Sequence, residues 1–212
     1  ADVAAELKAM KEEWLREWAP ELSSAEVPIN QYRVVNDLKK AVDSAKVIIT
    51  HEAGTPREQL VPFWECKTPR GYLGWGKSTQ LGHGLGLIMG AKLANPDKLC
   101  INFMGDASFG MTGMDIETAA RNKIGILTIV FNNAVMACER QVMEISTRKY
   151  DAIDIGGDYC KIAEGLNVAA LRVEHPGQII PALKEGISVT QSGAPFLIEI
   201  MAKQGYEFSR YP

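Results

Sequence analysis

The chain has 212 residues, of which 46% are hydrophobic and 23% charged, and this composition predicts a globular domain with a buried core. Because proteins that bind polyanions are usually strongly basic, the formal net charge of −3 disfavours a nucleic-acid partner. The longest apolar runs have the length of strands, and the acidic, amphipathic first residues are unlike a signal peptide, so we expect no membrane span.

Hydrophobic periodicity predicts helices that alternate with short apolar strands. The expected helices are residues 1–18, 31–43, 81–94, 114–122, 159–166 and 178–190, and the expected strands are residues 47–50, 99–104, 126–131, 169–173 and 196–201. The strands contain few polar residues, as is typical when helices cover both faces of a sheet. The pattern therefore predicts an α/β fold with a doubly wound, mostly parallel sheet flanked by helices.

We expect residues 1–28 to form an N-terminal helix and a connector, and residues 29–212 to form the domain. Trp14 and Trp18 lie at helical spacing in the first segment, and we expect them to dock that helix onto the domain. The glycine-rich stretch 71–90 indicates backbone packed close to a ligand or to another chain. The four cysteines include no C-x-x-C pair, which disfavours zinc, an iron–sulfur cluster and disulfides. We therefore expect reduced thiols in a cytoplasmic protein.

Two of the expected strands end in polar residues of matching chemistry. One leads into Gly105-Asp106-Ala107-Ser108 and the next into Asn132-Asn133. One crossover helix separates them, so the right-handed βαβ rule places the strands side by side, with Asp106 and Asn133 within reach of one point. A carboxylate, an amide oxygen and a backbone carbonyl are hard oxygen ligands, which phosphate oxygens and water would complete to the octahedron of Mg²⁺.

The residues around Asp106 also suit a phosphate. We expect Gly105 to allow a sharp turn, Ser108 to donate its hydroxyl to phosphate, and the following helix to present N–H groups to the anion. Gly-Asp or Asn-Asn alone would indicate an ordinary turn. The pair is more specific, because each dipeptide ends a buried strand and one crossover joins the two.

These motifs resemble the GDG…NN motif of thiamine diphosphate (ThDP)-dependent enzymes, in their acetolactate synthase-like branch. The similarity covers nearly the whole chain, from Pro28-Ile29-Asn30 through Glu52-Ala53-Gly54-Thr55 and Ala94-Asn95-Pro96-Asp97 to Pro195-Phe196-Leu197-Ile198-Glu199. The resemblance implies the ThDP-binding fold, with ThDP and Mg²⁺ as cofactors. It also implies that the chain is the C-terminal, diphosphate-binding part of such an enzyme.

The resemblance assigns roles to individual residues. It implies that Asp106, Asn133 and the Val135 carbonyl ligate Mg²⁺, and that Gly105, Ala107 and Ser108 contact the diphosphate. It further implies that Thr79, Gln80 and Leu81 hold the aminopyrimidine, with Leu81 as the apolar wedge that bends the cofactor. Thr55 and Met136 are expected near the cofactor, and Cys138 and Glu139 near the substrate.

The chain departs from the family pattern at three places. Ala107 replaces the usual third glycine, Leu81 replaces the commoner methionine or isoleucine, and Lys123-Ile124-Gly125 lacks the proline often found before that strand. None of these changes removes an expected metal ligand.

Two histidines and one glutamate are candidates for acid–base chemistry. His51 and His83 fall near expected cofactor loops, and imidazole titrates near neutrality. We favour a structural role for His51 and consider His83 and Glu139 as catalytic candidates, although a histidine in such a place is often structural and a helical glutamate is often simply exposed.

A P-loop NTPase is the rival interpretation, because Gly71-Tyr72-Leu73-Gly74-Trp75-Gly76-Lys77-Ser78 fits G-x-x-x-x-G-K-[ST]. A P-loop must follow a buried strand and open a helix. The residues before Gly71 are polar and interrupted by proline, and glycines at 82, 84 and 86 follow. This context disfavours the P-loop.

In the resembled family a glutamate on a separate pyrimidine-binding domain activates the cofactor, and nothing in residues 1–98 looks like that domain. We therefore expect one subunit of a split enzyme or the C-terminal piece of a longer one, in a hetero-oligomer with a dimeric core. The expected activity is that of a lyase or transferase, such as a decarboxylase or carboligase, on 2-oxo acids or 2-hydroxyacyl compounds. A non-catalytic subunit stays open, and so does the identity of the substrate.

Overall fold

Six parallel strands form one sheet in the computed structural model of the chain, which describes residues 2–74, 80–205 and 208. The strands are β1 Val47–His51, β2 Tyr72–Leu73, β3 Leu99–Gly105, β4 Ile126–Asn132, β5 Ala169–Val173 and β6 Phe196–Met201. Their order across the sheet is β2-β1-β3-β4-β6-β5, and each neighbouring pair is parallel.

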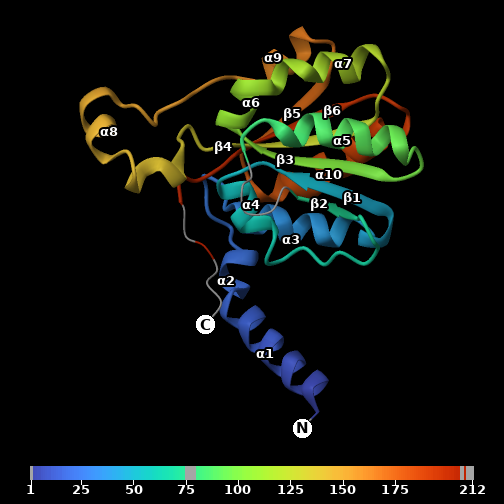
Figure 1. Cartoon of the computed structure of the whole chain (residues 1–212), viewed down its shortest axis with the longest axis vertical. Helices are drawn as coiled ribbons and strands as arrows, with labels where there is room; N and C mark the ends of the chain where they lie inside the picture. Colours follow the sequence, from blue (N-terminus) through green and yellow to red (C-terminus); the bar gives the residue numbers. More distant parts are fainter. Residues whose placement is uncertain (1, 75–79, 206–207, 209–212) are drawn as a thin grey trace.

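Helices cover both faces of this sheet (Figure 1). On one face lie α3 Gln31–Ala41, α4 Thr55–Leu60 and α10 Ile179–Gln191, and on the other lie α5 His83–Ala94, α7 Ile116–Arg121 and α9 Tyr159–Gly165. The expected α/β fold with a doubly wound parallel sheet is confirmed.

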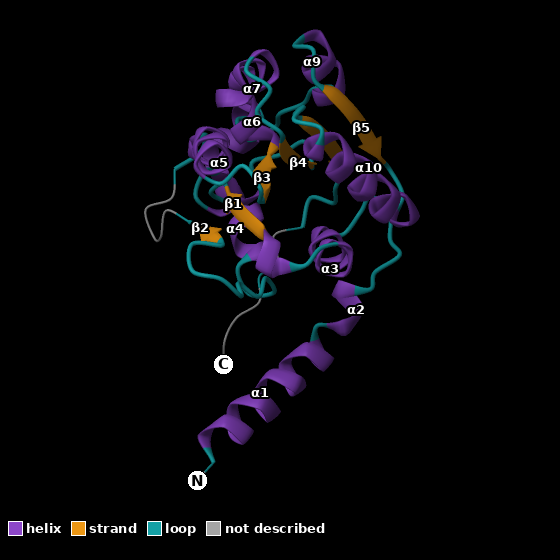
Figure 2. Ribbon diagram, turned by 90° about the vertical axis from the view of Figure 1, so that its right-hand side faces the viewer, coloured by secondary structure: helices purple, strands orange, loops and turns teal. Residues whose placement is uncertain are grey.

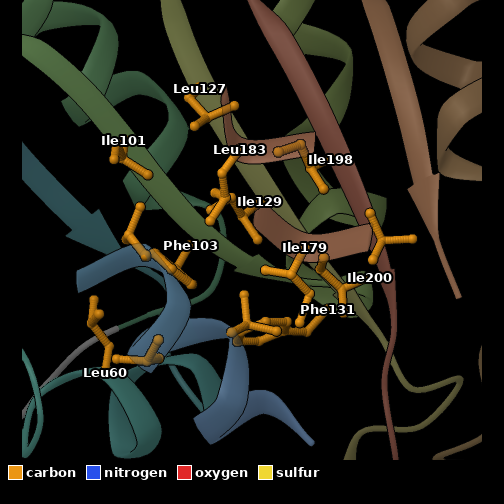
Figure 3. Packing of buried hydrophobic residues seen from close by; sticks show 14 of the residues in the cluster. Leu60, Ile101, Phe103, Leu127, Ile129, Phe131, Ile179, Leu183, Ile198 and Ile200 are labelled. Carbon is orange, nitrogen blue, oxygen red and sulfur yellow. The ribbon is translucent and has the colours of Figure 1, made fainter. Parts of the chain in front are cut away.

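The hydrophobic core has two parts because successive strand residues point to opposite faces. On β3, Ile101 and Phe103 pack with α4 and α10, whereas Cys100 and Met104 pack with α5 and α7. Figure 3 shows the first of these clusters, in which Leu60 approaches the sheet from α4. Burial on both faces explains why the strands are nearly uninterrupted apolar runs.

The N-terminal helix α1 Val3–Glu17 projects away from the sheet (Figure 2). Trp14 stacks on Phe63 with ring centroids 4.5 Å apart, and Trp18 contacts Tyr32 and Phe63. The expected docking role of both tryptophans is confirmed. Among the described residues, no helix combines the length and the apolar character that a bilayer crossing would need.

Several short elements were not expected from the sequence. They are β2, α2 Ala19–Leu22, α4, α6 Asp106–Thr112 and α8 Glu144–Tyr150. Each has at most seven residues, which is too few for a clear apolar period. The expected helix at 114–122 is α7, which begins at Ile116 after the 3₁₀ turn Gly113–Asp115.

Candidate functional site

A pocket opens at the carboxyl ends of β1, β3 and β4, which are neighbours in the sheet. Its lining residues are Ala53, Gly54, Thr55, Pro56, Leu81, Gly105, Asp106, Ala107, Ser108, Asn133, Val135, Met136, Ala137, Cys138 and Glu139. Ligands of parallel α/β sheets bind at this edge, where loops leave the strands. The described site residues expected from the sequence line this pocket, apart from Gln80 and His83. Thr79 lies outside the described residues.

Asp106 joins the ends of β3 and β4. Its Oδ2 atom accepts hydrogen bonds from the backbone N–H groups of Asn133 at 3.1 Å and Ala134 at 2.7 Å, and its Oδ1 atom accepts one from Ala107 at 2.8 Å. Burial raises the pKa of the Asp106 carboxyl, against the lowering effect of these hydrogen bonds. The expectation that Asp106 and Asn133 come together is confirmed.

The loop after β4 is held in one shape by short-range hydrogen bonds. Asn133 Oδ1 accepts from the N–H of Val135 at 3.3 Å, and the Val135 carbonyl accepts from Ala137 at 3.0 Å. Between them Ala134 has a left-handed backbone, with φ of 58°. The three groups expected to bind a metal, on Asp106, Asn133 and Val135, therefore lie together where the end of β3 meets the loop after β4. We call this place the corner.

Ser108 is the deepest polar residue of the pocket. Its side chain is fully buried, and within the described part of the chain its Oγ has no hydrogen-bond partner. Because a buried hydroxyl without a partner costs free energy, this atom suits a bound polar group. Among the described residues, no three His, Cys, Asp or Glu side chains cluster to hold a metal, so a cation here would depend on amide, carbonyl or ligand oxygens.

The expected sharp turn at Gly105 is wrong. Gly105 has an extended backbone, with φ of −89° and ψ of 165°, and α6 begins at the very next residue. A β-carbon there would meet only Pro56, at an ordinary 3.8 Å. The strand therefore enters the helix without a conformation that requires glycine.

The loop after β1 supplies a third wall, of which only Thr55 was expected near the cofactor. Gly54 has φ of 80°, and Pro56 stands in the first turn of α4. A β-carbon on Gly54 would lie 3.8 Å from the Cys138 sulfur, so this loop and the loop after β4 face each other. A Gly-Thr-Pro sequence shortly after a buried strand was the available signal, because it predicts a turn followed by a helix start.

Cys138 and Glu139 lie in the 3₁₀ turn Ala137–Gln141 on one side of the pocket. Burial raises the pKa of the Cys138 thiol, and the nearby Glu58 and Glu139 carboxylates act in the same direction. The thiol is therefore held in its neutral form, which is a poor nucleophile.

His51 and His83 lie beside the pocket rather than in its lining. His51 is buried, stacks on Tyr72 and has Nδ1 3.0 Å from the Glu52 carbonyl. Burial lowers the pKa of His51, which favours the neutral ring. This environment agrees with a structural role for His51. His83 has Nδ1 2.7 Å from the Gln80 carbonyl.

The region matching the P-loop pattern does not begin as a P-loop. Tyr72 and Leu73 form the edge strand β2 and pair with Ile49 and Thr50 of β1. The first residues of the pattern therefore form a strand. In a P-loop these residues would form the phosphate-binding loop that comes after a strand.

A family model described as "Thiamine pyrophosphate enzyme, C-terminal TPP binding domain" matches residues 52–200. The chain belongs to this family. The expected relationship to ThDP-dependent, acetolactate synthase-like enzymes is therefore confirmed, and the family model spans all the loops that form the pocket.

Curated relatives of this ThDP-dependent enzyme domain support the same branch. A probable acetolactate synthase large subunit of Methanococcus aeolicus is 28% identical over 91% of the chain and 33% of its own length. A mitochondrial acetolactate synthase catalytic subunit of Aspergillus candidus is 31% identical over 74% of the chain and 22% of its length. The sulfoacetaldehyde acetyltransferase of Alcaligenes xylosoxydans xylosoxydans is 28% identical over 80% of the chain and 28% of its length. The chain thus spans a third or less of these three relatives.

Among solved structures, the fold is similar to that of a ThDP-dependent 4-hydroxybenzoylformate decarboxylase of Rhodococcus jostii RHA1. The TM-score is 0.74 at 24% sequence identity, over 87% of the chain and 34% of that protein. This likeness shows the fold of the ThDP domain.

Proposed function

We propose that this chain holds Mg²⁺ and the diphosphate of ThDP at the carboxyl ends of β3 and β4. The observation that carries the proposal is the hydrogen bonding of the buried Asp106 carboxylate to the N–H groups of Asn133 and Ala134. These bonds unite the two motif segments in one corner and orient one carboxylate in it. The corner belongs to the part of the chain that the ThDP family model matches.

The polar atoms of the pocket suit Mg²⁺ and a diphosphate. Asp106, Asn133 and the Val135 carbonyl offer oxygens, the ligand type that Mg²⁺ prefers, and Mg²⁺ usually binds through few protein groups plus phosphates and water. The buried Ser108 hydroxyl, which has no partner in the described part of the chain, suits a phosphate oxygen. Gly105 and Ala107 line the same wall with little side-chain bulk.

When bound, ThDP supplies the electron sink for cleavage or formation of a bond next to a carbonyl. The residues of this chain bind, orient and shield it. Leu81 lines the pocket and, in this proposal, is the wedge that bends the cofactor. The proposal also gives the task of holding the aminopyrimidine to Gln80 and to Thr79, of which Thr79 lies outside the described residues. Thr55 contributes a small polar side chain to the pocket wall and Met136 an apolar one. In this proposal both lie near the cofactor ring. Orientation of this kind supplies roughly 7–11 kcal/mol of a reaction barrier in favourable cases.

The substrate side of the pocket is assigned to Cys138 and Glu139. We give the role of moving a proton to Glu139, since it lines the pocket, whereas His83 lies beside it. The acetolactate synthase and acetyltransferase relatives support a lyase or transferase acting on 2-oxo acids or 2-hydroxyacyl compounds. In this assignment the neutral Cys138 thiol shapes the pocket and does not attack the substrate.

A second chain or domain completes the site in this proposal. The cavity measures about 90 Å³, whereas binding sites for cofactor-sized molecules measure roughly 300–1,000 Å³. The activating glutamate would come from that pyrimidine-binding partner. Exposed apolar surface for such a contact exists beside α5, where Met111 and Met114 are 60% and 66% exposed. Gly86 and Gly90 leave open space on α5 itself.

We also propose that the ThDP-binding domain comprises residues 29–212, after the helix and connector of residues 1–28. An isolated β-bridge between Ile29 and Ala202 supports this boundary, because it pairs the start of the domain with the residue that follows β6.

Calorimetry of the full protein with ThDP, with and without Mg²⁺, tests the proposal. We expect ThDP binding that requires Mg²⁺, and loss of that binding in Asp106→Ala. Unchanged, Mg²⁺-dependent binding by Asp106→Ala would show that the metal assignment is wrong. Loss of 2-oxo acid turnover when Asp106→Ala replaces the wild-type chain in the complex would indicate a catalytic subunit, whereas unchanged turnover would indicate a non-catalytic one.

A further inference from the structure

Glu52 is a fully buried carboxylate at the end of β1, next to the pocket but outside its lining. Its Oε2 atom accepts a hydrogen bond from the N–H of Gly82 at 2.7 Å, and its Oε1 atom accepts one from the N–H of Gly84 at 2.7 Å. Burial raises the pKa of Glu52, while both hydrogen bonds favour its charged form. A buried carboxylate is costly, so its two short, directed bonds require an explanation.

Helix α5 lacks a cap of its own. Its N-cap residue is Gly82, which has no side chain, whereas α3 and α9 are capped by the adjacent Asn30 and Asp158. Glu52, at the end of β1, caps the helix instead. Its negative charge is favourable beside the positive end of the helix dipole. The beginning of α5 is therefore tied to the end of β1.

Both glycines that bind Glu52 leave too little room for a β-carbon unless a neighbouring side chain moves. Gly82 has φ of 92°, and a β-carbon there would lie 2.5 Å from the Thr112 methyl group. A β-carbon on Gly84 would lie 2.7 Å from Glu52 Oε1 and 2.6 Å from Asn102 Oδ1. The backbone thus approaches the carboxylate as closely as it can, and the arrangement has little freedom to shift.

The bonds of Glu52 and His83 hold the two peptide groups that flank Leu81. The Gly82 N–H belongs to the planar peptide group that follows Leu81, and this group is bonded to Glu52. The Gln80 carbonyl belongs to the peptide group that precedes Leu81, and it lies 2.7 Å from His83 Nδ1. Since a carbonyl only accepts, His83 Nδ1 carries the proton. The same Nδ1 lies 3.5 Å from Glu52 Oε2, so the two side chains also support each other.

We propose that Glu52 and His83 are positioning residues that set the backbone of Leu81, and with it the bend imposed on the bound cofactor. This inference rests on the proposed function, in which Leu81 is the wedge. Neither residue lines the pocket, so both act through Leu81. The metal corner at Asp106 and Asn133 is formed by other segments and does not depend on them.

A double-mutant cycle tests the inference in the full protein, with ThDP affinity as the readout. Glu52→Gln keeps the size of the side chain but turns one acceptor into an N–H donor facing a backbone N–H. We expect it to raise the Kd for ThDP about tenfold, as for loss of a charged hydrogen bond. In the Leu81→Ala background the same change should raise the Kd by less than about threefold, because coupled residues are not additive.

A second readout separates positioning from a general loss of structure. At saturating ThDP, the Mg²⁺ concentration that gives half-maximal binding should be the same in Glu52→Gln and the wild type. The control is Asp37→Asn, which neutralises a carboxylate of similar burial that pairs with Arg33 and Lys40 on α3. We expect no change in either quantity for this control.

If Glu52→Gln folds poorly, Gly84→Ala probes the same contact from the helix side. Its β-carbon would displace the Glu52 carboxylate, and we expect the same pattern of binding. Gly165→Ala is its control, because it adds the same atom at the end of α9, where nothing lies within 4 Å.

The outcomes are distinct. Unchanged ThDP affinity in Glu52→Gln, an equal effect with and without Leu81, or a parallel rise in the Mg²⁺ requirement would overturn the positioning role alone. A wild-type protein that binds no ThDP would overturn the proposed function and the inference that rests on it.

Discussion

Arg172 and Glu199 face each other across β5 and β6, and Nε and Nη2 of the arginine each lie 3.1 Å from Oε2 of the glutamate. The other carboxylate oxygen accepts a hydrogen bond of 2.7 Å from Nδ2 of Asn132, on β4. The fully buried Glu199 therefore links three neighbouring strands and holds the residue directly before Asn133.

Glu199→Ala is expected to lower the free energy of unfolding by about 3–5 kcal/mol, because it leaves the partners of a buried charge unpaired. Urea denaturation measures the change. Glu185→Ala, on the exposed side of α10, is the control and should stay within about 0.5 kcal/mol of the wild type. A loss below about 1 kcal/mol in Glu199→Ala would contradict the structural role of this carboxylate.

Asp158 makes the stability of the chain depend on pH. Hydrogen bonds from the side chain and backbone of Lys161, together with Arg172, lower the pKa of Asp158 from 3.8 to about 2. Because the folded pKa is below the unfolded value, this group stabilises the fold above pH 3.8, and the contribution is lost as the pH falls through about 2. Asp158→Asn should therefore show a shallower fall in melting temperature over that window. Equal slopes for variant and wild type would contradict this.

Asn133→Ala is expected to weaken Mg²⁺-dependent ThDP binding less than Asp106→Ala does. It removes a neutral oxygen that water can partly replace, whereas Asp106 is the charged member of the proposed ligand set and also anchors the loop after β4. Calorimetric titration of both variants with Mg²⁺ at fixed ThDP gives the comparison. The ligand assignment fails if Asn133→Ala is the more damaging change.

Met111→Asp is expected to weaken assembly with the partner without changing the stability of the chain. The side chain is 60% exposed, so the charge stays in water when the chain is alone but would be buried in an apolar interface. Analytical ultracentrifugation of the purified complex measures assembly. Leu7→Asp is the matched control, because Leu7 is 61% exposed and lies on α1, which projects away from the sheet (Figure 2). Equal effects of the two changes would exclude this face as the interface.

The sheet and the meeting of Asp106 with Asn133 were predictable from the sequence because their signals are local. β3 and β4 are uninterrupted apolar runs, each followed by polar residues, and one crossover rule places them together. The closeness of Asp106 and Asn133 could therefore be predicted from the sequence.

The contacts of Glu52 and Glu199 were not predictable in the same way. Each binds backbone groups at least 30 residues away, at Gly82 and at Cys160. The glutamates themselves look ordinary in sequence, and periodicity gives no sign of a buried charge. Thr55 was expected near the cofactor, but the contact of its neighbour Gly54 with Cys138 was not, because it joins loops that follow two different strands.

The strand order has a consequence for synthesis on the ribosome. β6 lies between β4 and β5 in the sheet, although it is the last of the six strands to be made. β5 therefore emerges without the neighbour it will pair with, and the Asn132 side chain emerges without the carboxylate that will hold it. Non-local pairing of this kind slows folding and prolongs the exposure of unpaired strand edges. A nascent chain arrested before residue 196 would contain Asp106 and Asn133 but lack the strand whose Glu199 holds the neighbouring Asn132.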